Sequence, residues 1–163
     1  MGRMQLVRAG TATLLTSLLV AGCAVEDSSG KVEPDPNATL QERVDAVLHA
    51  IPGGHQVSAT EIDYDGMTAI VDPSYNAQGP VAPAPPACSD GWFCINVSGT
   101  AFAFFKCQLW DLSNWFGNAP FNNNQTPGTV ARFYDQNFNV IWTNTAKATG
   151  TVNVTPFWHF RPC

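Results

Sequence analysis

Apolar residues recur at helical spacing in the first half of the chain. Thr39-Leu40-Gln41-Glu42 has the S/T-x-x-E form of a capping box, in which the Thr and Glu side chains satisfy amide donors at a helix start. The apolar positions after this box fall on one helix face, and a Pro-Gly-Gly stop at 52–54 follows them. They are Leu40, Val44, Val47, Leu48 and Ile51. The pattern therefore predicts a helix that ends near residue 51.

Two short strand-like runs, at 57–64 and 67–71, come next and flank Asp65-Gly66, a pair typical of a type I′ hairpin turn. A unit made only of this helix and hairpin, residues 39–72, is too small to be stable alone. We expect it to dock on the rest of the chain or to stay loosely ordered. A removable pro-segment and a permanent part of the domain both fit the pattern. The proline-rich residues 73–87 predict an extended linker.

Residues 88–163 have the pattern of an all-β domain, with short apolar runs between turns rich in Asn, Gly and Pro. The predicted strands are 92–97, 102–107, 130–134, 138–143 and 155–162, with turns at 98–100 and 135–137. Strands of this length and spacing are typical of a sandwich or a small barrel. The long connection at 113–129 is predicted to be an irregular loop, the kind of segment in which binding sites are common.

The first 22 residues have the form of an export signal. Arg3 and Arg8 precede a short uncharged apolar run, which is too short to span a bilayer. The run closes with Val20-Ala21-Gly22-Cys23, which resembles a bacterial lipobox with Cys23 as the lipid attachment site. The alternative is cleavage after Ala24, with Cys23 discarded. We expect an exported chain, anchored by lipid at the outer face of the cell membrane or else secreted, with residues 23–38 as a disordered tether.

The cysteine count supports the export interpretation. Setting Cys23 aside leaves Cys88, Cys94, Cys107 and Cys163, an even number in an exported chain. Three pairings are possible, and we favour Cys88–Cys94 with Cys107–Cys163. A zinc site is disfavoured because the spacings lack paired C-x₂₋₄-C motifs.

Charge and aromatic content divide the chain into two parts. Residues 24–87 carry ten acidic and two basic side chains, whereas residues 88–163 carry three acidic and four basic ones. All five Trp and all ten Phe also lie within 88–163. The absence of a basic stripe argues against a nucleic-acid partner. A nearly neutral, aromatic-rich domain favours contact through shape and apolar surface instead.

Several short motifs resemble one family. They are CSDGWFC at 88–94, FFKC at 104–107, LSNW at 112–115, the closing Cys163, and the upstream PGG at 52–54 with EIDYDG at 61–66. Over roughly residues 40–163 the chain resembles secreted actinobacterial proteins with a βγ-crystallin-like Greek-key domain. These proteins are grouped with the peptidase-inhibitor family whose founding member blocks thermolysin-like metalloproteinases. The resemblance implies a βγ-crystallin-like Greek-key sandwich, here with two disulfides and preceded by a short helix plus β-hairpin, and it implies peptidase inhibition.

The chain departs from this family at two kinds of position. A crystallin-type hairpin places an aromatic, a second aromatic five residues later and then a Gly; Phe133 and Phe138 match, but Val140 replaces the Gly. Calcium-binding crystallins also carry an N/D-N/D-x-x-S/T-S run. The run at 122–127 offers Asn122, Asn123 and Thr126 but no carboxylate, and calcium prefers charged oxygens. We therefore expect an Asn-rich turn there, with no metal and no cofactor.

Candidate catalytic groups are scattered. His49 and His55 lie on the predicted helix and just after it, and His159 lies in an alternating strand where it should face solvent. The three Asp residues of 88–163, at 90, 111 and 135, each sit beside a predicted turn, where Asp is common. A general acid–base mechanism needs paired groups in one cleft. We therefore expect that the protein is not an enzyme.

A peptidase inhibitor needs only a rigid exposed segment that fits a protease cleft. We predict that the connection at 113–129 supplies it, with Trp115, Phe116 and Phe121 as apolar anchors; 143–156 is a second candidate loop. The alternative is that these aromatics fill the core. The predicted function is inhibition of an extracellular metallo- or serine peptidase, with no nucleic-acid partner and membrane contact only through the lipid. The rival is a non-inhibitory structural, stress-protective or carbohydrate-contacting surface module.

Overall fold

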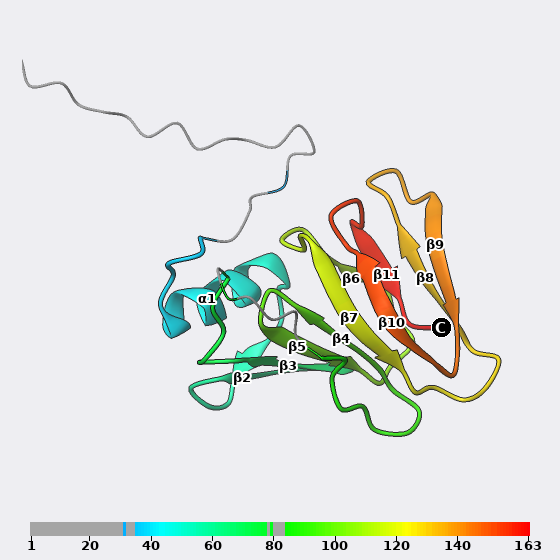
Figure 1. Ribbon diagram of the computed structural model, residues 1–163, viewed down its shortest axis with the longest axis horizontal. Coiled ribbons are helices and arrows are strands. Elements are labelled where there is room, and N and C mark those ends of the chain that lie inside the picture. Colours follow the sequence, from blue (N-terminus) through cyan, green and yellow to red (C-terminus); the bar gives the residue numbers. More distant parts are fainter. Residues whose placement is uncertain (1–30, 32–34, 78, 80–83) are drawn as a thin grey trace, which may run out of the picture.

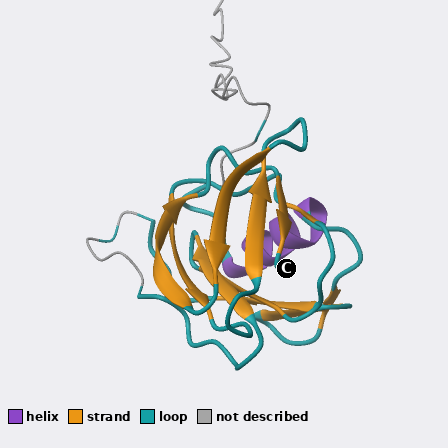
Figure 2. Ribbon diagram, turned by 90° about the vertical axis from the view of Figure 1, so that its right-hand side faces the viewer, coloured by secondary structure: helices purple, strands orange, loops and turns teal. Residues whose placement is uncertain are grey.

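The computed structural model describes residues 31, 35–77, 79 and 84–163, and it consists of two antiparallel sheets with one helix at one end (Figure 1). Figure 2 shows the strands as two layers. The elements are α1 (Leu40–Ala50), β1 (His55–Gln56), β2 (Glu61–Tyr64), β3 (Met67–Val71), β4 (Phe93–Val97), β5 (Thr100–Phe104), β6 (Trp110–Asp111), β7 (Asn118–Asn123), β8 (Val130–Tyr134), β9 (Val140–Thr145), β10 (Ala148–Asn153) and β11 (His159–Arg161). None of the helices in this described part is long and apolar enough to cross a membrane. The all-β prediction with one short helix is confirmed.

The predicted helix forms with its capping box. The Glu42 amide donates to Thr39 Oγ1 at 3.3 Å, and the Thr39 amide donates to Glu42 Oε2 at 2.7 Å. These contacts hold the pKa of the Glu42 carboxyl below its ordinary value, the backbone hydrogen bond from Thr39 having the largest effect. Val44, Val47 and Ile51 are buried, so the predicted apolar face is the one that packs on the sheet.

The strand order interlocks the two sheets. One sheet has the order β1-β2-β3-β5-β4-β7-β10, and the other has the order β6-β11-β8-β9. In the four consecutive strands β4–β7 the last strand pairs with the first, and the third lies in the opposite sheet. The four strands β8–β11 repeat this arrangement, because β11 pairs with β8 while β10 joins the larger sheet. Each sheet therefore contains one strand from the other group of four.

The upstream hairpin is part of the larger sheet. β3 pairs with β5 in five-residue register, from Met67 opposite Phe104 to Val71 opposite Thr100. The hairpin turn at Asp65-Gly66 forms, but its predicted type I′ geometry is wrong. That turn needs positive φ at both central residues, and only Gly66 has it, with φ 115°.

Four strands were not predicted, and one of them is β1, which pairs with β2. β6 and β7 lie within or beside the supposed loop at 113–129, and β10 lies in the second candidate loop at 143–156. The sequence of β7, NAPFNN, is rich in residues that strands usually avoid. Pro120 is tolerated because the register of β7 with β4 stops at Phe121, so no β4 residue needs the amide that proline lacks. Tertiary pairing thus overrides local preference, and the prediction of an irregular loop is wrong.

Strand boundaries shifted at most of the other predicted strands. The strands at 67–71 and 130–134 are confirmed at both ends. The remaining predictions overlap their strands but begin or end elsewhere: 57–64 becomes Glu61–Tyr64, 92–97 becomes Phe93–Val97, 102–107 becomes Thr100–Phe104, 138–143 becomes Val140–Thr145, and 155–162 becomes His159–Arg161.

Both predicted disulfides are confirmed. Cys88 and Cys94 have Cα atoms 5.6 Å apart, and Cys107 and Cys163 have Cα atoms 5.4 Å apart. The second bridge spans 56 residues and ties the segment after β5 to the end of the chain. Closing a loop of that size stabilises a fold by about 4 kcal/mol in the chain-entropy model.

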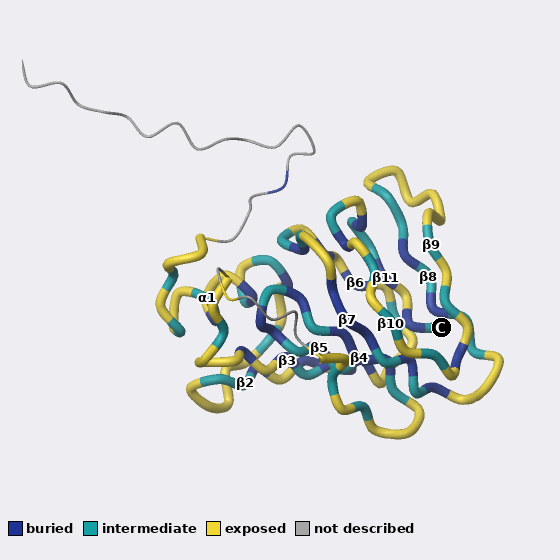
Figure 3. Tube along the Cα trace, in the orientation of Figure 1, coloured by how far each residue is buried: buried dark blue, intermediate teal, exposed yellow. Residues whose placement is uncertain are grey.

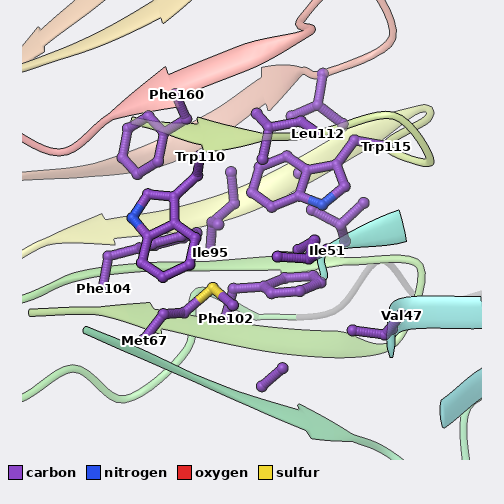
Figure 4. Close-up of a cluster of buried hydrophobic side chains, with 14 of the residues drawn as sticks. Val47, Ile51, Met67, Ile95, Phe102, Phe104, Trp110, Leu112, Trp115 and Phe160 are labelled. Carbon is purple, nitrogen blue, oxygen red and sulfur yellow. The ribbon is translucent and has the colours of Figure 1, made fainter. Parts of the chain in front are cut away.

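The core lies between the sheets and extends under α1. Figure 3 shows β4, β5 and β7 largely buried, whereas β9 is mostly exposed or half-buried. In Figure 4, Val47 and Ile51 of the helix segment lie on the same apolar cluster as Phe102 and Trp115. The helix and the sheets therefore share one core.

Arg43 fastens the helix to the sheet. Its guanidinium donates to the Asp72 carbonyl at 2.9 Å and to the Gly99 carbonyl at 3.3 Å, and it lies 5.2 Å from the centre of the Tyr75 ring. The Tyr75 ring in turn lies against Gly99, in the β4–β5 turn. A Cβ atom at Gly99 would stand 2.1 Å from Tyr75 Cγ. The turn therefore requires glycine for both its φ of 73° and its closeness to Tyr75.

We predict that Gly99→Ala lowers the free energy of unfolding by roughly 2–4 kcal/mol, because left-handed strain and the Tyr75 clash add together. Gly117→Ala is the matched control: its φ is 75°, and nothing lies within 4 Å of its added Cβ. It should cost only about 1–2 kcal/mol. Urea unfolding followed by circular dichroism measures both variants. Equal losses would show that the Tyr75 contact does not constrain the turn.

We also predict that residues 88–163 alone are much less stable than residues 35–163. The shorter fragment bares the β5 edge and loses eight buried residues: Val44, Val47, Ile51, Ile62, Tyr64, Met67, Ala69 and Val71. Each fully buried large apolar side chain contributes about 1.5–3 kcal/mol. Thermal unfolding and sedimentation of the two oxidised fragments compare them. An unchanged unfolding midpoint with a monomeric short fragment would identify residues 39–72 as a separable segment.

Candidate binding surface

Two of the three predicted protease anchors are core residues. Trp115 is buried and lies 5.0 Å, ring centre to ring centre, from Phe102. Phe121 is buried in β7 and stacks on Phe93 at 6.0 Å. The prediction that they are exposed apolar anchors is therefore wrong: Phe121 belongs to the buried strand β7, and the segment before that strand packs Trp115 into the core. Phe116 is half-buried beside Lys31.

The calcium candidates do not form a site. Asn122 and Asn123 are successive residues of β7, so their side chains leave opposite faces of the strand. The Asn122 amide donates to the Pro86 carbonyl at 3.3 Å, and the buried Asn123 amide donates to Asn144 Oδ1 at 2.8 Å. Thr126 lies on the surface beyond the strand. Among the residues that the structure describes, no group of three or more His, Cys, Asp or Glu could hold a metal ion.

The environment of one of the three histidines, His159, differs from the prediction. His49 and His55 are exposed, but His159 is not a solvent-facing residue. Its Nδ1 lies 2.6 Å from Asp111 Oδ1, because β11 and β6 are neighbours and His159 faces Asp111 in register. The Phe138 ring stacks on the His159 ring, and the two ring centres are 4.0 Å apart. The His159–Asp111 pair joins two adjacent strands that are 48 residues apart in sequence, so sequence spacing could not reveal it.

The β8–β9 hairpin carries a rigid tip. Asp135 accepts hydrogen bonds at Oδ1 from the Asn137 and Asn139 amides, each at 2.8 Å, and at Oδ2 from the Asn139 side chain at 2.9 Å. The Asp135 amide also donates to the Asn139 carbonyl at 3.0 Å. Together these bonds close the turn and hold Phe138 at a φ of 63°. His159 supports the ring of Phe138 from beneath.

A β-bulge follows this tip in β9. Phe133 faces Trp142, whereas the next residue of β8, Tyr134, faces Val140, so that Ile141 is an extra residue without a partner in the register. A bulge breaks the alternation of a strand and re-aims its side chains. Both Val140 and Ile141 therefore point to the surface, although they are neighbours in sequence.

The hairpin consequently presents three large apolar side chains within four residues. Phe138 is 57% exposed, Val140 is 51% exposed and Ile141 is 43% exposed. Val140 and Ile141 lie on β9, an edge strand of the smaller sheet, and Phe138 lies in the turn before it, at the opposite end of the molecule from α1 (Figure 1). An exposed apolar cluster on an edge strand is a hazard unless something binds it. We call these three residues the hairpin cluster.

Apart from the hairpin cluster, a hollow lies between α1 and the larger sheet. It has a volume of about 680 Å³. Its apolar lining includes Val47, Phe102 and Trp115, and its polar rim includes Glu42 and Arg43. Two polar atoms of lining residues, Asn114 Oδ1 and Trp115 Nε1, are buried without a hydrogen-bond partner. This volume falls in the range of small-ligand pockets.

Comparison of the chain with protein-family models, with curated proteins and with solved structures finds no match. The hairpin cluster and the hollow beneath α1 are therefore the two features whose residues bear on function.

The hairpin tip should respond to acid through Asp135. Hydrogen bonds from Asn139, first from its side chain and then from its backbone, hold the pKa of Asp135 below its ordinary value. A depressed pKa means that the ionised carboxylate stabilises the tip above the unfolded-state pKa of about 3.9, and that this contribution is lost as pH falls through the lower folded-state value.

We therefore predict that the amide signals of Asn137 and Asn139 shift together on acidification, with a midpoint below that of an ordinary Asp. Nuclear magnetic resonance of labelled protein measures the midpoint. In Asp135→Asn the carboxylate is absent, so the same two signals should no longer titrate and their hydrogen exchange should be faster. A midpoint at the ordinary Asp value would contradict the closed tip.

Proposed function

We propose that this chain is an exported, non-catalytic binding protein that inhibits an extracellular peptidase through the β8–β9 hairpin. The hairpin cluster is the observation that supports this function. It offers Phe138 on a closed turn and Val140 and Ile141 on the strand that follows. The cluster replaces the earlier candidate at 113–129, whose anchors Trp115 and Phe121 are buried.

The rigidity of the hairpin suits an inhibitor. A segment that is already in its bound shape loses little conformational freedom on binding, so more of the contact energy appears as affinity. Here Asp135 fixes the turn, and the stacked His159 ring supports Phe138. A large exposed aromatic beside two aliphatic side chains fits a hydrophobic specificity pocket. This is the kind of pocket that metallo- and serine peptidases with apolar preference present.

The strand order supports a βγ-crystallin-like Greek key. In a Greek key the fourth strand returns to lie beside the first. β7 lies beside β4 and β11 beside β8, so each group of four strands satisfies this description. The resemblance to the inhibitor family concerns the same domain, and the upstream hairpin extends the sheet at β5.

Export and lipid anchoring complete the proposal. Disulfides persist in oxidising compartments. The two bridges use four of the five cysteines and leave Cys23 available for lipid. Cys23 and the signal at 1–22 lie outside the described residues, as does most of the tether at 23–38. We place the protein at the outer face of the cell membrane, held there by its lipid, or free outside the cell if Cys23 is removed.

The hollow beneath α1 favours a second function, a non-inhibitory surface module that binds a small polar ligand such as a carbohydrate. The unpartnered Trp115 Nε1 is a donor and the unpartnered Asn114 Oδ1 is an acceptor. Sugars offer both kinds of group together with apolar faces. Quenching or shift of tryptophan fluorescence on titration with oligosaccharides tests this function independently of any peptidase.

We predict that the oxidised protein inhibits a thermolysin-like or a subtilisin-like peptidase stoichiometrically, and that Phe138→Asn weakens inhibition about 30-fold or more, as expected for loss of an aromatic hot-spot residue. Asn tolerates positive φ, so the turn should persist. Residual peptidase activity measured against inhibitor concentration gives the inhibition constant.

Val57→Asn is the matched control. Val57 is 58% exposed, close to the value for Phe138, but it lies between β1 and β2 in the other sheet. This variant should inhibit as the unchanged protein does. Equal weakening by both variants, or intact inhibition by Phe138→Asn, would remove the hairpin from the contact surface. Failure of the unchanged protein to inhibit either class would move the function to the surface module.

A further inference from the structure

Lys31 is buried in a cage of backbone carbonyls. The residue is only 3% exposed. The Nζ atom donates hydrogen bonds to the carbonyl of Trp115 at 3.2 Å, to the carbonyl of Thr155 at 3.0 Å and to the carbonyl of Phe157. A protonated lysine has three N–H donors, and three backbone carbonyls converge on this one.

Two aromatic rings complete the cage. The Nζ atom lies 5.7 Å from the centre of the Phe116 ring and 5.3 Å from the centre of the Trp158 ring. Both distances are within the range at which a cation is attracted to a ring face. Carbonyl dipoles and ring faces thus both stabilise a positive charge at the same point.

The cage walls are held in place without Lys31. The two segments that form them, at 115–117 and 154–158, are joined by the Gly117 amide donating to Thr155 Oγ1 at 2.9 Å and by the Val154 amide donating to the Gly117 carbonyl at 2.8 Å. The Trp158 amide donates to the Tyr134 carbonyl of β8 at 2.8 Å. The acceptors are therefore fixed by the sheets and do not depend on their ligand for their positions.

This geometry selects among cations. Three converging carbonyls suit the three N–H bonds of a primary ammonium. A planar guanidinium presents its donors in a fixed fork, and a quaternary ammonium has no N–H at all. Ring faces alone would accept any of these cations. The carbonyls are therefore the part of the cage that confers specificity.

We propose that this cage is a binding site for a primary alkylammonium group, that Lys31 of the tether is its resident ligand, and that a soluble primary alkylammonium occupies it when Lys31 is removed. The site docks the tether on the domain at one defined point. This inference is independent of the hairpin cluster and of peptidase inhibition. The sequence placed Lys31 in a disordered tether, and a single lysine among acidic residues gave no signal of a partner.

The first experiment measures how fast each lysine reacts. The chain has three lysines, and Lys106 and Lys147 are half-exposed members of surface ion pairs, so they serve as internal references. A short pulse of an amine-acetylating reagent on the oxidised protein, followed by peptide mass spectrometry, gives the three rates. We expect Lys31 to react at least about tenfold more slowly than the references, since it must first leave the cage.

Variants of the cage wall provide the matched pair for this experiment. Phe116→Leu removes a ring face and should raise the rate at Lys31 several-fold, while Phe116→Tyr keeps the ring and should leave it unchanged. The reference rates at Lys106 and Lys147 should be the same in both variants, which shows that the fold is intact. Equal rates at all three lysines in the unchanged protein would overturn the assignment of Lys31 as the resident ligand.

The second experiment tests the class of ligand. Lys31 lies outside every helix and strand, so Lys31→Ala should leave them intact. We expect n-propylammonium chloride to shift the Trp158 indole and Gly117 amide signals of Lys31→Ala saturably in nuclear magnetic resonance, and tetramethylammonium chloride to bind at least about tenfold more weakly. The unchanged protein should not respond, because its site is filled. Equal responses to both cations, or equal responses of both proteins, would overturn the proposal.

Discussion

The aromatic cluster between the two sheets is the constraint on which the rest of the structure depends. The Phe160 ring lies 4.8 Å from the rings of Phe93 and Phe104 and 4.2 Å from that of Phe133, centre to centre. These side chains come from both sheets, so the cluster forms only when both sheets have paired. Fully burying each ring stabilises the fold by about 1.5–3 kcal/mol. The exchange of β6 and β10 between the sheets ties the two layers around this cluster, and the disulfide to Cys163 fixes the end of the chain that carries Phe160.

Because the core uses most of the aromatic residues, the few rings left near the surface define where the protein can act. Phe138 is held out by a turn, while Phe116 and Trp158 line a cation cage. Trp115, next to Phe116 in sequence, faces inward instead. An aromatic count therefore predicts a core but not a binding surface; strand direction, bulges and turns decide which rings remain outside.

Local signals in the sequence predicted the local parts of the fold. The capping box at Thr39, the helix face, the Cys88–Cys94 disulfide and the strands Met67–Val71 and Val130–Tyr134 are found in the structure. The long-range Cys107–Cys163 disulfide, favoured among three possible pairings, is found as well. The strand β7 could not be predicted, because Pro120 and its Asn residues disfavour a strand and only pairing with β4 and β10 stabilises it. The prediction of Phe121 as a protease contact was wrong for the same reason, because Phe121 belongs to β7. The His159–Asp111 pair and the Lys31 cage join segments far apart in the chain, which residue spacing does not encode.

The ammonium cage and the hairpin cluster lie next to each other at the start of β11. The ring of Trp158 is a wall of the ammonium cage, and the ring of the next residue, His159, stacks on the ring of Phe138. The Trp158 amide is also bonded to the carbonyl of Tyr134, the residue before Asp135 at the hairpin tip. A substitution at Trp158 that moves this backbone would disturb both sites together. Phe116 contacts the cage from the other segment, so a substitution there can separate docking of the tether from any action of the hairpin.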